Sequence, residues 1–187
     1  TPKTNVENIK QSISFLVNSC FNVYYHDIDN ISSKNKYSKL LLSREFWKCL
    51  EPYKLCLITQ SDGFLIKKGL CKFVNDILEH KSYEYIGSLH KQNLDKSYLY
   101  NGGLSLRCIQ SSLDAINSFY YDDIPEDVFF NKHLRIAPYQ IGVTCAIEHY
   151  YDAINIEDMV GCHQIWECNN NEITNKIFSN IIKNIHA

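Results

Sequence analysis

The chain has 187 residues, of which 45% are hydrophobic, and this size and composition suit one ordinary domain with a substantial core. Its 19 basic and 21 acidic side chains give a formal charge of −2, so it lacks the positive field of a nucleic-acid-binding protein. No apolar run approaches the roughly 20 residues that cross a bilayer, so we expect no membrane segment in it.

The first half of the chain alternates between helical and extended patterns. Residues 5–20 have apolar side chains close to helical spacing, with Asn5 as a candidate cap, and residues 21–28 resemble a strand. A second helix is expected over residues 35–50. Residues 53–62 have the strongest strand pattern, a short, almost wholly apolar run that ends in polar residues. Such runs are typical of a central parallel strand that is covered on both faces.

The second half continues this alternation and closes with a helix. We expect helices over residues 70–81, 109–120, 125–134 and 171–185, a strand over 83–89, a turn entering a strand over 98–108, and an extended segment over 136–148. Strands and helices that follow one another in this way indicate α/β architecture.

Eight cysteines are scattered singly along the chain, and no CxxC pair occurs. This pattern disfavours a disulfide framework and predicts buried free thiols in a reducing compartment, the cytoplasm, or in a virion if the protein is viral. The nearest approach to a ligand cluster is Cys162, His163 and Cys168, where a zinc site would still need a well-spaced fourth ligand.

Asp62 ends the segment of residues 53–62, directly after LCLITQS. In an open α/β sheet, ligands bind beyond the carboxyl ends of the strands, and a carboxylate there can hold a divalent cation that binds a diphosphate. Ser-Asp-Gly is also a common turn sequence, so capping of a turn by Asp62 is an equally physical interpretation.

Glu126 and Asp127 follow Pro125 at the start of a predicted helix. They either compensate the helix dipole or include a general base, and only one of two neighbouring side chains can point at a given atom. Arg107 ends an alternating strand. It either stabilises a leaving phosphate or forms a structural ion pair with Asp127 or Glu126.

Gly102 and Gly103 stand side by side in a chain with seven glycines. A glycine pair fits where the backbone turns with positive φ or where another group approaches it closely. His163 follows a glycine later in the chain and is either a metal or phosphate contact or a structural histidine.

The segments LITQSDGFL, YEYIGSLH, NGGLSLR, PEDVFF and GCHQIW occur in this order within roughly residues 38–167. This combination resembles the DUF5672 family, which is related to glycosyltransferases of the GT-A fold. The resemblance implies one α/β, glycosyltransferase-like domain over residues 1–187, with a Rossmann-like, mostly parallel central sheet flanked by helices. The chain opens with a helix, so the first strand normal in that fold is expected to be missing.

The resemblance also implies a metal site. Asp62 stands where GT-A enzymes keep an Asp-x-Asp motif and would bind Mn²⁺ or Mg²⁺ and the donor diphosphate. The motif is reduced here, because Gln60 and Ser61 are not carboxylates. His163 resembles the late histidine that completes the metal or diphosphate site.

By the same resemblance, Asn101, Gly102 and Gly103 would line the sugar pocket of the donor site, with the glycines making room for the sugar. Glu126 and Asp127 match the acidic motif near the acceptor, and one of them would be the base. Arg107 would bind the donor and stabilise its leaving phosphate.

The implied activity is transfer of a hexosyl-type group from a nucleotide sugar, UDP-linked as a family-level expectation, to an acceptor hydroxyl by direct displacement. The acceptor would be a glycan, a protein or a small molecule. Two alternatives stay open. The reduced metal motif favours a non-catalytic nucleotide-sugar or glycan-binding domain, and the tyrosine-rich segments FYYDD and EHYYDA suit an interaction module of a larger multidomain protein.

Overall fold

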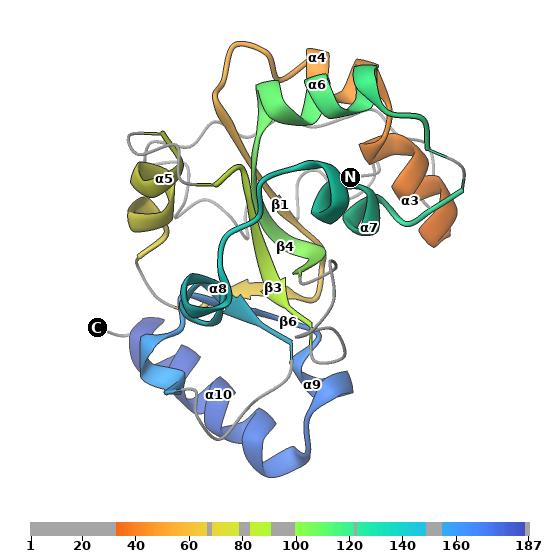
Figure 1. Cartoon of the computed structure of the whole chain (residues 1–187). Coiled ribbons are helices and arrows are strands. Elements are labelled where there is room, and N and C mark those ends of the chain that lie inside the picture. The colour runs from red at the N-terminus through yellow and green to blue at the C-terminus, as the bar shows by residue number, and fades with distance from the viewer. Residues whose placement is uncertain are drawn as a thin grey trace.

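The computed structural model describes residues 33–66, 69–78, 83–90, 100–121, 123–148 and 155–185 (Figure 1). The helix predicted over residues 5–20 and the strand predicted over 21–28 lie outside these ranges. The expectation of a missing first strand concerns the same part of the chain and belongs to the GT-A fold, which the mixed sheet described below does not have.

Helices form most of the surface around a central sheet. They are α3 (Lys34–Leu41), α4 (Arg44–Lys48), α5 (Leu70–Leu78), α6 (Ile109–Ser118), α7 (Glu126–His133), α8 (Tyr139–Cys145), α9 (Ile165–Cys168), α10 (Asn171–Ile185) and the short 3-10 helix η3 (Ile156–Asp158). Helices α3, α4, α6 and α7 gather at one end of the sheet and α9 and α10 at the other (Figure 1). Ser33 and Ser43 cap α3 and α4 by accepting hydrogen bonds from the backbone of the third residue on.

The six described strands form one mixed sheet in the order β1-β4-β3-β5-β6-β2. Their bounds are β1 (Leu55–Thr59), β2 (Gly63–Leu65), β3 (Tyr85–Leu89), β4 (Tyr100–Cys108), β5 (Ala146–Ile147) and β6 (Gly161–His163). The pairs β1–β4, β4–β3 and β6–β2 are antiparallel, and β3–β5 and β5–β6 are parallel. The two ends of the order, β1 and β2, are joined by one short turn, so the sheet nearly closes on itself like a barrel.

The prediction of a GT-A-like, Rossmann-like, mostly parallel sheet is therefore wrong. The strand predicted over residues 53–62 exists as β1, but it lies at one end of the strand order and pairs antiparallel with β4, with Leu55 opposite Cys108 and Thr59 opposite Leu104. The expectation that this strand is covered on both faces is wrong too, because only Ile58 of β1 is buried and the other four residues are half-buried or exposed. An apolar run also carries no information about the direction of the neighbouring strand, which depends on distant pairing.

The extended segment predicted over residues 136–148 is also mostly wrong. Residues Tyr139–Cys145 form helix α8 after the extended cap residue Pro138, Ile136 makes an isolated parallel bridge to Tyr85, and only Ala146 and Ile147 form a strand. The segment is short and apolar, and such runs fit a buried helix as well as a strand. The elements predicted over residues 70–81, 83–89, 109–120, 125–134 and 171–185 are confirmed as α5, β3, α6, α7 and α10, and the strand expected within 98–108 is confirmed as β4.

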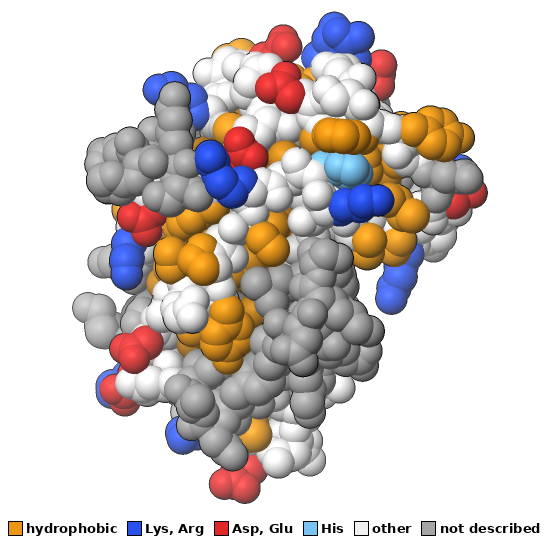
Figure 2. All heavy atoms as spheres, viewed as in Figure 1, with side chains coloured by type: hydrophobic (Ala, Val, Ile, Leu, Met, Phe, Trp, Pro, Cys, Tyr) orange, Lys and Arg blue, Asp and Glu red, His pale blue; other side chains and the backbone are white. Residues whose placement is uncertain are grey.

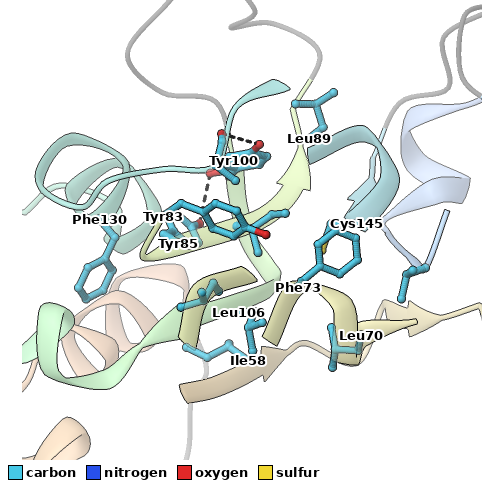
Figure 3. Close-up of a cluster of buried hydrophobic side chains, with 14 of the residues drawn as sticks. Ile58, Leu70, Phe73, Tyr83, Tyr85, Leu89, Tyr100, Leu106, Phe130 and Cys145 are labelled. Carbon is cyan, nitrogen blue, oxygen red and sulfur yellow. Dashed lines mark hydrogen bonds between the residues drawn. The ribbon is translucent and has the colours of Figure 1, made fainter. Parts of the chain in front are cut away.

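The hydrophobic core lies between the sheet and its covering helices, and it contains several buried aromatic side chains (Figure 3). Tyr85 and Tyr100 are both fully buried, with their rings edge to face at 6.0 Å. The Tyr100 hydroxyl donates to the Ala137 carbonyl at 2.8 Å, which satisfies the polar end of a buried ring. This bond ties the segment before α8 to the start of β4.

Figure 2 shows acidic, basic and hydrophobic side chains interspersed on one face. Among the described cysteines, Cys145 and Cys162 are buried as expected, and burial raises the pKa of each thiol to about 12, whereas Cys49 and Cys71 are exposed. None of the helices in the described ranges is long and apolar enough to cross a bilayer.

Candidate functional site

The glycine pair lies in a bulge of β4 and not in a turn before it. Gly87 of β3 pairs with Ser105, while its neighbour Ser88 pairs with Asn101, so residues 102–104 are extra on the β4 side. Asn101 Oδ1 accepts a hydrogen bond from the Gly103 amide at 2.7 Å and closes the bulge. Neither glycine has positive φ, so conformation alone does not require glycine here.

Steric crowding explains why glycine occupies both positions 102 and 103. A Cβ on Gly102 would collide with the carboxylate of Glu126 and the guanidinium of Arg107, and a Cβ on Gly103 would collide with the imidazole of His163. The expected close approach is therefore made by side chains of this chain. The adjacent residues Gly102 and Gly103 thus contact two different polar clusters.

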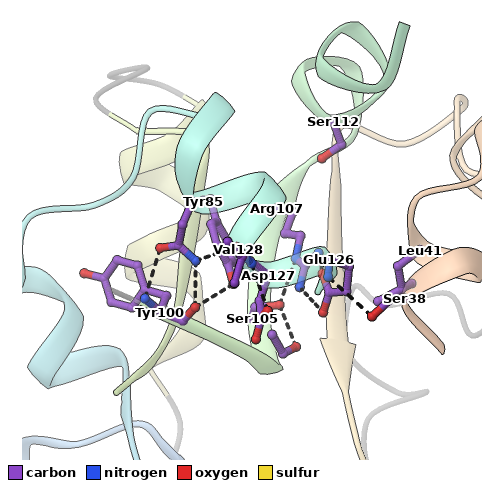
Figure 4. Close-up of polar contacts among 12 residues, drawn as sticks. Ser38, Leu41, Tyr85, Tyr100, Ser105, Arg107, Ser112, Glu126, Asp127 and Val128 are labelled. Carbon is purple, nitrogen blue, oxygen red and sulfur yellow. Dashed lines mark hydrogen bonds and ion pairs between the residues drawn. The ribbon is translucent and has the colours of Figure 1, made fainter. Parts of the chain in front are cut away.

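The first cluster is the ion pair between Arg107 and Glu126 (Figure 4). The guanidinium donates two hydrogen bonds to the Glu126 carboxylate, at 2.5 and 3.2 Å, and Nε donates a third to Ser105 Oγ at 3.0 Å. The guanidinium also lies over the rings of Tyr85 and Phe130 at 4.8 and 4.9 Å.

Both charges of this pair are removed from water, because the side chains are 0% and 4% exposed. Burial raises the pKa of Glu126, and Arg107 opposes that shift. The structural ion pair that the sequence left open for Arg107 is present, with Glu126 as its partner. These contacts leave Glu126 with little capacity to act as a base, and they hold Arg107 away from any solvent-filled space.

Asp127 differs from its neighbour. It is half-buried in the first turn of α7, where Oδ1 accepts a hydrogen bond from the Val128 amide at 2.8 Å, and the Asn131 side chain donates to its carbonyl. Since successive helical residues point about 100° apart, Glu126 faces Arg107 and Asp127 faces elsewhere. Asp127 is therefore the less buried of the two predicted acidic residues.

The second cluster centres on His163 at the end of β6. Its Nδ1 lies 2.7 Å from Glu148 Oε1, and its Nε2 lies 3.2 Å from Asp62 Oδ1 and 3.3 Å from Gln60 Oε1. His163 and Glu148 are almost fully buried, whereas the Asp62 side chain is 21% exposed. The structure thus brings the two predicted metal residues, Asp62 and His163, into contact.

Asp62 is held in place by the residue after His163. Gln164 donates from its side chain to Asp62 Oδ2 and from its backbone to the Asp62 carbonyl, both at 3.1 Å. Gln164 adopts a left-handed conformation with φ of 49°, which is uncommon outside glycine. The turn at Asp62 and the end of β6 therefore form one rigid unit.

The ligand set of this cluster fits a hard divalent cation. When His163 is neutral and donates from Nδ1 to Glu148, its lone pair lies on Nε2, which faces two oxygens and would be available to a cation. Asp62 Oδ1 is buried, and no donor in the described part of the chain makes a hydrogen bond to it. Two side-chain ligands suit a cation that completes its shell with substrate phosphate and water.

No group of three or more histidine, cysteine or acidic side chains in the described ranges is arranged to hold a metal by itself. The prediction that Mn²⁺ or Mg²⁺ binds here stays a prediction. The same holds for the donor-binding roles of Asn101, Gly102, Gly103 and Arg107.

Two further residues of this region escaped the sequence analysis as individual site candidates. Glu148 follows the short strand β5 just as Asp62 follows β1, and a carboxylate after an apolar strand is the signal that could have identified it. Gln60 was noted only as a departure from an acidic motif.

Comparison with known protein families matched residues 20–163, more than half of the chain, to the family described as protein of unknown function, DUF5672. The chain therefore belongs to the DUF5672 family. Searches of curated proteins and of solved structures found no match. The family description assigns no activity, so function rests on the chemistry of the site.

Proposed function

We propose that this protein transfers a glycosyl group from a nucleotide-sugar donor, UDP-linked, to an acceptor hydroxyl. The observation that carries the proposal is the convergence of Asp62 Oδ1, Gln60 Oε1 and His163 Nε2, with one buried carboxylate oxygen left without a hydrogen bond. Such a set suits a cation that binds a diphosphate. The proposal does not depend on a GT-A fold, because sites of one chemistry recur on different folds.

Asp62 and His163 would hold the cation, and Glu148 would keep the His163 ring in the orientation that presents Nε2. A divalent cation there would neutralise the charge that develops on the diphosphate leaving group. The Asp62 side chain is 21% exposed, so a ligand would approach the cluster from the side of Asp62.

Asp127 would act as the general base. It accepts the proton of the acceptor hydroxyl while the hydroxyl oxygen bonds to the anomeric carbon, and the bond from that carbon to the diphosphate oxygen breaks with its electron pair. The buried ion pair of Glu126 with Arg107 supports this step by holding the first turn of α7 in place. Gly102 and Gly103 allow this ion pair and the cation cluster to lie on opposite sides of one strand.

The first experiment is thermal unfolding with UDP-, GDP- and CMP-sugars, each with and without Mn²⁺. A ligand at about 100 times its dissociation constant adds roughly 2.7 kcal/mol, a shift of several degrees for a chain of this size. A Mn²⁺-dependent shift that is lost in His163→Ala supports the proposal. No shift with any probe contradicts it and favours an interaction module.

The base is tested by Asp127→Asn with the best donor of that panel. We expect unchanged donor binding and a kcat lowered by roughly 10²- to 10⁴-fold, because only proton transfer is removed. Asp114→Asn, on the exposed face of α6, is the matched control and should turn over at the wild-type rate. Donor binding by the wild type without any turnover would instead favour a non-catalytic binding domain.

A further inference from the structure

Three adjacent strands of the sheet, β3, β5 and β6, are parallel, and three polar side chains stand in one row across their ends. The last residues of β3 and β5, Leu89 and Ile147, pair with each other, and the same register continues to β6. One step further along these strands come His90, Glu148 and His163. Because residues in one row of a parallel sheet point to the same face, these three side chains lie side by side.

Glu148 is the middle member of this row, and each of its carboxylate oxygens faces a different histidine. Oε1 lies 2.7 Å from Nδ1 of His163, and Oε2 lies 3.7 Å from Nε2 of His90. The Glu148 side chain is 2% exposed, whereas the His90 side chain is 24% exposed. A carboxylate buried to this degree costs free energy unless donors face its oxygens, and the two imidazole rings supply donors on both.

The contacts on both oxygens set the plane of the Glu148 carboxylate. The last torsion of a glutamate side chain is broad, so a contact with one oxygen alone leaves the carboxylate able to rotate. Such a rotation would move Oε1 away from Nδ1 of His163. A separation of 3.7 Å is longer than a direct hydrogen bond, yet an N–H group directed at a buried carboxylate still stabilises it, because little water screens the charge.

The backbone of Glu148 is held independently of the His90 side chain. Its amide donates to the Leu89 carbonyl at 3.3 Å, and its carbonyl accepts a hydrogen bond from the Asn169 side chain at 2.8 Å. A change of the His90 side chain therefore leaves these backbone contacts in place and acts on the carboxylate alone.

We propose that His90 is a positioning residue of the cation site. It holds Oε2 of Glu148, and Glu148 thereby keeps the His163 ring in the orientation that presents Nε2 toward Asp62 and Gln60. This inference rests on the proposed function, because it concerns the cation that the function requires, and it extends the site from Asp62 across three strands to His90.

The test compares two substitutions that differ only in where the side chain places a donor. The amide of His90→Gln can donate from about the position of Nε2, which faces Glu148, whereas the amide of His90→Asn stands where Nδ1 stands. The probes are the Mn²⁺ complexes of UDP, GDP and CMP, with Kd measured by calorimetry. We expect His90→Asn to weaken binding about three- to tenfold and His90→Gln to weaken it less than about twofold.

The matched control is His133→Asn. His133 stacks on Phe119 at the end of α7, with ring centroids 4.0 Å apart, and this substitution should leave Kd unchanged. Equal binding by wild type and His90→Asn, or equal weakening by His90→Asn and His90→Gln, overturns the role of His90 alone. Binding of no probe by the wild type overturns the proposed cation site and this inference with it.

A double-mutant cycle shows whether His90 acts through Glu148. Glu148→Gln should weaken binding of the same probe roughly 10- to 100-fold, as is typical when the partner of a metal-binding histidine is changed. Addition of His90→Asn to Glu148→Gln should then weaken binding no further, because both changes remove one shared contact. Full additivity of the two changes would show that His90 acts independently of Glu148 and would overturn the inference.

Discussion

Two charged clusters lie on either side of the glycine pair of β4, and they differ in how completely their members are paired. The Arg107–Glu126 cluster is closed, because the guanidinium and the carboxylate satisfy each other and both are out of contact with water. The Asp62–His163–Glu148 cluster is open at one end, since Asp62 is partly exposed and one of its oxygens lacks a hydrogen bond. A closed charged cluster supports a fold, and an open one is available for ligands.

The largest expected effect is on the closed cluster. Glu126→Gln leaves the charge of Arg107 buried without a counter-charge and should lower the free energy of unfolding by about 3–5 kcal/mol. Urea unfolding monitored by tryptophan fluorescence measures this, helped by the buried Trp47.

The matched control for this change is Glu84→Gln, which weakens the more exposed pair of Glu84 with Arg135, 3.7 Å apart. It should cost no more than about 1 kcal/mol. Equal effects of the two substitutions would show that burial does not set the contribution of the Arg107–Glu126 pair, against our interpretation.

A smaller effect is expected at the glycines that separate the clusters. Gly102→Ala and Gly103→Ala each force a Cβ into an occupied space and should each cost about 1–3 kcal/mol in urea unfolding. Only Gly103→Ala displaces His163, so only this variant should lose stabilisation by Mn²⁺ together with a nucleotide sugar. Loss of that stabilisation in Gly102→Ala as well would mean that the two clusters are not independent.

The smallest effect on stability is expected at the open cluster. Asp62→Asn removes the charge but keeps an oxygen that can accept the hydrogen bond from Gln164, and the buried Oδ1 has no hydrogen bond to lose, so in the absence of metal it should change the free energy of unfolding by less than about 1 kcal/mol. The Mn²⁺-dependent shift should nevertheless disappear. A destabilisation as large as that of Glu126→Gln would place Asp62 in a structural role and contradict the comparison of the two clusters.

Much of the fold could be predicted from local patterns. Helices α5, α6, α7 and α10 and strands β1, β3 and β4 lie where periodicity and caps indicate, because amphipathic spacing and capping are local properties. The prediction for residues 136–148 was wrong because a short apolar run suits a helix or a strand equally well, so local pattern does not distinguish them.

The direction of the strands was not predictable in the same way. β1 has the apolar composition of a central parallel strand, yet it pairs antiparallel with β4 at one end of the sheet order. Composition is a property of the segment itself, whereas pairing depends on contacts with residues about 50 positions away in the chain. No single segment carries that information.

The candidate site shows the same difference between local and long-range information. The sequence by itself determined which chemical groups are available, including Asp62, Asp127 and His163, and which family the chain resembles, because residue identity and order are local facts. Only the tertiary structure decided that Glu126 is neutralised by Arg107 and that Glu148 orients His163. The physical reason is that pairing, burial and exposure of a side chain are set by elements distant in the sequence, which meet only when the sheet and helices pack.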